Sequence, residues 1–94
     1  MPFAIYCLDK PNSGPVRMAA RPDHLAYLVP FEDRIVFAGP LLADDNQTMI
    51  GSLLILDLPD RAAAEKFSAN DPYRKAGLFQ TVNITAWRKT YPKA

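Results

Sequence analysis

The single histidine of the chain, His24, and the aspartate Asp71 are the residues whose types best suit proton transfer. Imidazole changes charge near neutral pH, and a neighbouring carboxylate fixes its tautomer and makes it a better base. His24 stands where we expect a helix to begin and its free N–H groups to suit an anion. Asp71, before Pro72, stands at a second expected helix start. If the two side chains meet, they form a general acid/base pair, and both are candidate catalytic residues.

Each member of this pair also has a purely structural interpretation. His24 could be a surface or helix-capping imidazole, and Asp71 could serve only as an N-cap, worth about 1 kcal/mol. Helices that pack on the same face of a sheet would bring the two groups together without strain. The chemistry therefore depends on the elements that carry them.

Four further residues are candidates for binding a substrate. Arg17 and Arg21 could clamp a carboxylate or phenolate through their forked donors, or could be solvated charges. Ser52, which follows Gly51, could offer a hydroxyl or could simply open a strand. Tyr73 could line a pocket or pack in the core. Together these side chains suit a small polar or anionic ligand.

Other kinds of site are poorly supported. One histidine and scattered carboxylates do not make a metal ligand set, and four isolated glycines do not make a phosphate loop. We therefore expect no metal and no cofactor. The amine of Pro2, if Met1 is removed, could act as a base, but no other residue supports this. Cys7, in an apolar strand, is expected to be a small core residue.

The composition is that of an ordinary globular protein. The 94 residues suit one domain, 1–94, with 49% hydrophobic residues and a net charge of +1. This charge gives no case for nucleic acid binding. A single cysteine cannot form an internal disulfide, and no apolar run approaches the length of a membrane span. We expect a soluble cytoplasmic protein with no membrane partner.

Prolines and glycines divide the chain into short elements. Gly39-Pro40 is expected to end a strand, and a polar loop is expected from Ala43 to Thr48. Apolar runs bounded by such residues predict four strands, at residues 3–8, 35–38, 52–58 and 79–87.

Two helices separate these strands. Pro22 suits the first turn of a helix, which Pro30 should end or kink. Asp60 is a suitable N-cap for a second helix at residues 61–69. The order strand, helix, strand, strand, helix, strand predicts a ferredoxin-like α+β fold, βαββαβ, with an antiparallel four-stranded sheet and both helices on one face.

The first and third strands are apolar on both faces. Ala4, Tyr6 and Leu8 point away from their neighbours Phe3, Ile5 and Cys7, and the third strand repeats this pattern. Helices on one face would leave the other as an exposed apolar patch, which soluble proteins rarely tolerate. We therefore expect a homodimer packed sheet to sheet.

Four separated segments carry a family resemblance: Arg21 to Leu28 (RPDHLAYL), Ala38-Gly39-Pro40, Gly51-Ser52, and Asp71-Pro72-Tyr73 with Ala76-Gly77. Their order and spacing resemble the YciI-like (YCII-related) family over nearly the whole chain. The resemblance implies a ferredoxin-like fold of the dimeric α+β barrel type, related to the muconolactone isomerase group. It also implies an active site with a histidine and an aspartate, which fall on His24 and Asp71. The stretch between Leu28 and Ala38 departs from the family by being short and containing Pro30.

These observations predict a small cofactor-independent enzyme that uses His24 and Asp71 for general acid/base chemistry. Isomerisation, lactone chemistry or elimination on a small polar or anionic molecule would all suit it. Two other functions remain open, a small-molecule binding module without turnover and a protein-interaction module acting through the sheet face. Loss of turnover without loss of folding in His24→Ala would distinguish the enzyme from both.

Overall fold

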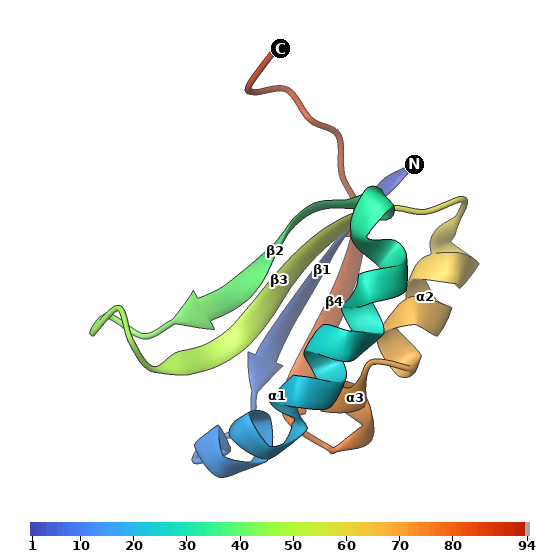
Figure 1. Cartoon of the computed structure of the whole chain (residues 1–94). Coiled ribbons are helices and arrows are strands. Elements are labelled where there is room, and N and C mark those ends of the chain that lie inside the picture. Colours follow the sequence, from blue (N-terminus) through green and yellow to red (C-terminus); the bar gives the residue numbers. More distant parts are fainter. Residues whose placement is uncertain (94) are drawn as a thin grey trace.

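Four antiparallel strands form one sheet in the computed structural model (Figure 1). The structure describes residues 1–93. The elements are β1 (Pro2–Asp9), α1 (Gly14–Leu28), the 3₁₀ helix η1 (Val29–Arg34), β2 (Ile35–Leu42), β3 (Met49–Asp57), α2 (Arg61–Ala69), α3 (Pro72–Lys75) and β4 (Phe79–Ala86). The strands lie in the order β2-β3-β1-β4. This confirms the predicted α+β class with βαββαβ order, to which α3 adds one short turn before β4.

The predicted start of α1 is wrong. The helix begins at Gly14, with Pro15 in its first turn, and Pro22 lies inside it. Both prolines fit the pattern of a helix start, but an internal proline costs one backbone hydrogen bond and is tolerated here. His24 therefore lies in the later part of α1, and the free N–H groups of a helix start are not available to it. The helix ends at Leu28, two residues before Pro30, as predicted.

The second and third strands are longer than predicted. β2 continues through Gly39-Pro40 to Leu42, because β2 is an edge strand and its free side needs no donor from proline. β3 begins at Met49, three residues before the predicted start. The loop between them, residues 43–48, matches the prediction.

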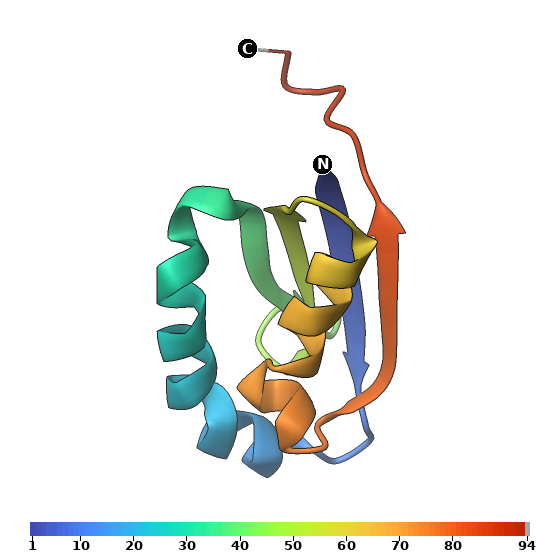
Figure 2. The ribbon, with the colours of Figure 1, turned by 90° about the vertical axis from the view of Figure 1, so that its right-hand side faces the viewer.

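Helices α1 and α2 lie across the same face of the sheet (Figure 2). Tyr27 of α1 donates a hydrogen bond to the Phe67 carbonyl of α2 at 2.9 Å, and their rings lie 5.3 Å apart. Beneath the helices lies the buried cluster of the core, formed by Phe3, Ile5, Cys7, Leu54, Leu56, Leu58, Ala64 and Phe67. Burial of Cys7 confirms that it is a core residue, and its pKa rises to about 12 because burial disfavours the thiolate.

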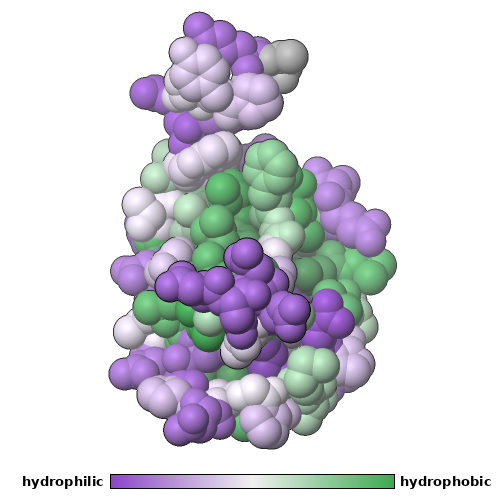
Figure 3. Space-filling view, turned by 90° about the vertical axis from the view of Figure 1, so that its left-hand side faces the viewer, coloured by the Kyte–Doolittle hydropathy of each residue, from purple (hydrophilic) through white to green (hydrophobic). Residues whose placement is uncertain are grey.

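The opposite face of the sheet has no helix over it among the described residues. Tyr6 pairs with Leu53 there, and the exposed fractions of Tyr6 and Phe37 are 42% and 59%. Apolar side chains gather over this face, with the polar connection between β2 and β3 in front of it (Figure 3). The sheet-to-sheet dimer remains a prediction. No helix within residues 1–93 is long and apolar enough to cross a membrane.

Candidate functional site

His24 of α1 and Asp71, the N-cap of α3, are in contact. The Nδ1 of His24 lies 2.8 Å from the Oδ1 of Asp71, and the side chains are 9% and 5% exposed. An ionised carboxylate only accepts hydrogen bonds, so Nδ1 is the donor in a contact with it, and Nε2 is the ring nitrogen that the carboxylate leaves free. The two side chains that the sequence singled out therefore do meet, in a contact between α1 and the connection that leads into α3.

Local structure fixes the carboxylate of this pair. Asp71 is the N-cap of α3, and its Oδ1 also accepts a hydrogen bond from the backbone N–H of Tyr73 at 2.9 Å. Pro72 occupies the first turn of α3, where its missing N–H costs nothing. The structural interpretation of Asp71 as an N-cap is thus confirmed, and the same oxygen holds the imidazole.

Arg17 forms a second buried pair two turns before His24 on α1. Its Nε and Nη2 bind the two carboxylate oxygens of Asp9 at 2.8 and 2.9 Å, and Nη2 also donates to Ser52 Oγ at 2.9 Å. Burial lowers the pKa of Arg17, but hydrogen bonding and the charge of Asp9 outweigh it, so the pKa is raised. The pair therefore fixes a charged guanidinium and a hydroxyl side by side.

Tyr73 connects the two pairs. Its ring is stacked on the His24 imidazole, with centroids 4.0 Å apart and planes 15° apart, and the Arg17 Cζ lies 4.5 Å from the ring centre. Burial raises the pKa of Tyr73, although the charges of Arg17 and Arg21 oppose this, so the hydroxyl stays protonated at neutral pH. One side chain thus limits the movement of both the imidazole and the guanidinium.

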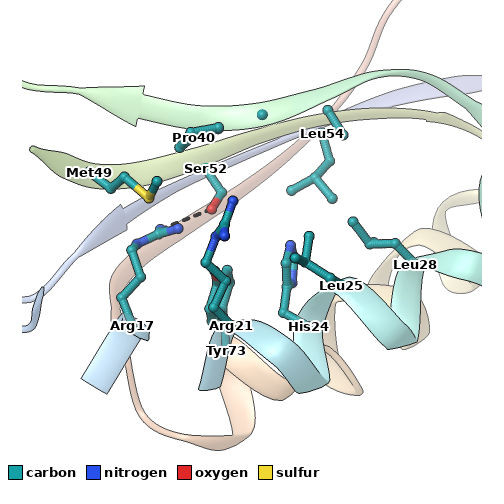
Figure 4. Close-up of a pocket in the computed structure, with 12 residues that line it drawn as sticks. Arg17, Arg21, His24, Leu25, Leu28, Pro40, Met49, Ser52, Leu54 and Tyr73 are labelled. Carbon is teal, nitrogen blue, oxygen red and sulfur yellow. Dashed lines mark hydrogen bonds between the residues drawn. The ribbon is translucent and has the colours of Figure 1, made fainter. Parts of the chain in front are cut away.

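A cavity of about 210 Å³ lies between α1 and the sheet and is open to solvent (Figure 4). Its polar part comes from Arg17, Arg21, His24, Ser52 and Tyr73. Its apolar part is formed by Leu25, Leu28, Ala38, Gly39, Pro40, Met49 and Leu54. Gly39-Pro40, which the sequence predicted to end a strand, is instead part of β2 and forms one wall of the cavity. An apolar wall facing a few polar groups is typical of a small-molecule site.

The structure brings together all six residues that the sequence nominated. Five of them line the cavity, and Asp71 lies behind His24. Their roles in catalysis and binding remain predictions. Sequence reasoning missed Asp9, which lies one residue beyond the predicted first strand (residues 3–8) and is the last residue of β1. The only signal in the sequence was the position of Asp9 near a strand end, eight residues before Arg17. This spacing predicts no contact unless the positions of the strand and the helix in space are known.

Metal binding has no support from the arrangement. Among residues 1–93 no group of three or more histidine, cysteine, aspartate or glutamate side chains could hold a metal ion. The Asp9 carboxylate is instead bound by the Arg17 guanidinium, and that of Asp71 by the His24 imidazole. The polar side chains that line the cavity carry one imidazole, two hydroxyls and two guanidinium groups. Guanidinium groups and hydroxyls can donate hydrogen bonds to an anionic oxygen.

A ferredoxin-like α+β fold, with its helices on one face of a four-stranded sheet, defines the class of protein, and a family model matches nearly the whole chain. The model of the YCII-related domain matches residues 1–88, and the chain belongs to this family. Protein YciI of Escherichia coli O6:H1 is 33% identical over 98 residues, which cover 97% of this chain and the whole of that protein.

Two solved structures place the chain more closely. One is 5-chloro-2-hydroxyhydroquinone dehydrochlorinase (TftG) from Burkholderia phenoliruptrix AC1100, in complex with 2,5-dihydroxybenzoquinone. It is 37% identical, with a TM-score of 0.87 and 94% of each chain covered. An antibiotic biosynthesis monooxygenase, 14% identical with a TM-score of 0.53, covers 95% of this chain and shares the fold alone.

Proposed function

We propose that the protein is a cofactor-independent enzyme in which His24 transfers protons and Asp71 orients it. The observation that carries this proposal is the buried His24–Asp71 contact, whose imidazole borders a cavity of about 210 Å³. The Asp71 carboxylate holds the Nδ1 hydrogen, which leaves Nε2 as the basic nitrogen. This geometry supports a general base that stays in one tautomer and one plane.

Arg17 and Ser52 supply the complementary charge stabilisation. When a base removes a proton from an oxygenated substrate, negative charge develops on the substrate oxygen. The Arg17 guanidinium and the Ser52 hydroxyl, joined at 2.9 Å, border the same cavity and suit that oxygen. Asp9 holds Arg17 before the substrate arrives, so little reorganisation is needed during the reaction.

Elimination is the reaction type that this apparatus and the relatives support best. Removal of a proton by His24 leaves an electron pair, which forms a double bond while the leaving group departs with its own bonding pair. No oxidant or reductant is required. The 37% identical relative carries the name of a dehydrochlorinase, an enzyme that removes hydrogen chloride. Isomerisation uses the same proton transfers and differs only in having no leaving group.

The test measures chloride release from 5-chloro-2-hydroxyhydroquinone under anaerobic conditions. We expect His24→Gln to lower the rate by about 10²- to 10⁴-fold, the usual contribution of general acid–base catalysis. Asp71→Asn keeps an acceptor for the Tyr73 N–H but removes the carboxylate that orients the imidazole, so its rate should also fall by at least about 10²-fold. Asp23→Asn, an exposed change on the same helix, is the control and should leave the rate unchanged.

A small-molecule binding module is the second candidate, because the cavity needs no chemistry to hold a ligand. It predicts that the wild type binds 2,5-dihydroxybenzoquinone but neither releases chloride nor catalyses exchange of the quinone ring hydrogens in heavy water. Full turnover in His24→Gln, with a folded structure by circular dichroism, would instead refute the role of His24 directly.

A further inference from the structure

The two arginines of α1 that border the cavity are in different states. Arg17 is 2% exposed and is bound by Asp9 and Ser52. Arg21, one turn later, is half-buried and has no hydrogen bond or ion pair with any of residues 1–93. Residues four apart share a face of a helix, so both guanidinium groups are directed towards the sheet, and Figure 4 shows the Arg21 side chain extending from α1 towards the strands.

The charge of Arg21 is therefore not matched within the cavity. The carboxylate of Asp9 is occupied by Arg17, and that of Asp71 by His24 and a backbone N–H. Neither aspartate is among the residues that line the cavity. A guanidinium that is partly removed from water and has no partner is costly unless an anion binds to it.

The size of the cavity limits what that anion can be. A volume of about 210 Å³ corresponds to roughly seven water molecules at ~30 Å³ each. This is room for one six-membered ring with small substituents. The leucines Leu25, Leu28 and Leu54 line the cavity and suit the face of such a ring.

We propose that Arg21 binds a second, ionised oxygen of the substrate, so that the site selects single-ring compounds with two oxygen substituents, at least one of them anionic. One oxygen lies at Arg17 and Ser52, and the other at Arg21. The proposal rests on the proposed function, because it concerns the same cavity. It adds a substrate class, acidic hydroxyquinones and related phenolates, and a residue that selects them by charge.

Binding of two probes tests the selection. The first is 2,5-dihydroxybenzoquinone, which is anionic at neutral pH, and the second is hydroquinone, a neutral ring of similar size. We expect Arg21→Gln to weaken binding of the quinone by about 10- to 100-fold, the range for a hydrogen bond to a charged group. Binding of hydroquinone should change less than about twofold, since a neutral oxygen gains little from the guanidinium charge. Arg21→Lys should be intermediate, because it keeps the charge but loses the fork.

Arg88→Gln is the matched control, since it removes one positive charge from an exposed position after β4. It should leave both affinities unchanged. Equal weakening of both probes by Arg21→Gln, no weakening of either, or no binding of the quinone to the wild type would each overturn the proposal. The two proposals fail separately. If His24→Gln loses turnover while Arg21→Gln keeps its affinity for the quinone, only the proposed role of Arg21 is wrong. If Arg21→Gln weakens binding of the quinone alone but the wild type shows no turnover, only the proposed reaction is wrong.

Discussion

The two faces of the sheet are built from alternate residues of the same strands, yet they are used differently. On the face under the helices, the apolar residues of β1 lead to Asp9 and those of β3 begin after Ser52, so core and cavity share one surface. The open face carries Tyr6 and Leu53 opposite each other. The comparison indicates that the polar groups lie where helices can bury and fix them, because burial strengthens their interactions.

The largest expected difference in stability separates two leucines of β3 that lie on opposite faces of the sheet. Leu56 is fully buried under the helices and Leu53 is half-buried on the open face. We expect Leu56→Ala to lower the free energy of unfolding by about 3 kcal/mol, because it leaves a cavity in the core. Leu53→Ala should cost less than about 1 kcal/mol. Urea denaturation at low protein concentration measures both, and equal losses would contradict the assignment of the two faces.

High pH should lower the free energy of unfolding through Cys7, which is buried on the face of the sheet that the helices cover. Burial raises the pKa of this thiol from 9.0 to about 12, so the folded state keeps a proton that the unfolded state loses. The stability that this burial provides is complete below about pH 9 and is lost as the pH rises towards 12. The free energy of unfolding should fall by up to about 1.4 kcal/mol per pH unit in that range.

The control for this effect is Cys7→Ala, whose stability should vary less with pH between 9 and 10, because tyrosine ionisation contributes equally to both proteins. Urea midpoints at each pH measure the slope, and the absolute stability of the variant is not needed. Identical slopes in wild type and variant would contradict the effect of burial on the thiol.

The smallest expected effect on unfolding comes from a substitution on the open face, which should instead change whether two chains associate. Leu53→Lys should change the unfolding free energy of the single chain by less than about 1 kcal/mol, because lysine can keep its stem on the sheet and its charge in water. If two sheets pack face to face, the same change should abolish the dimer. Sedimentation velocity measures the oligomeric state of both proteins. A wild type that stays monomeric at high concentration would contradict the predicted sheet-to-sheet dimer.

Local signals were enough for some elements. The predicted helix at residues 61–69 has the observed bounds of α2, because Asp60 caps it by accepting a hydrogen bond from the Ala63 N–H at 2.8 Å. For α1 the same kind of signal misled, since Pro15 and Pro22 both suit a first turn. Only contacts with the sheet and α3 decide that the helix passes through Pro22.

The site divides in the same way. Pairing of His24 with Asp71 was expected, because helices on one face of a sheet can bring their residues together, and the family resemblance supported it. The pairing of Arg17 with Asp9 was not expected, since it needs the end of β1 and the first turns of α1 to be placed in space. Long-range electrostatic partners are decided by tertiary packing, which sequence spacing does not encode.

Gly51 limits how this site can be redesigned. A Cβ placed there would lie 2.3 Å from the backbone oxygen of Cys7, so any side chain would force β1 and β3 apart. The next residue is Ser52, whose hydroxyl meets Arg17. A mutant library aimed at new substrates should therefore keep position 51 fixed. It can vary Met49 or Leu25, which line the cavity and are not part of the close contact between Gly51 and Cys7.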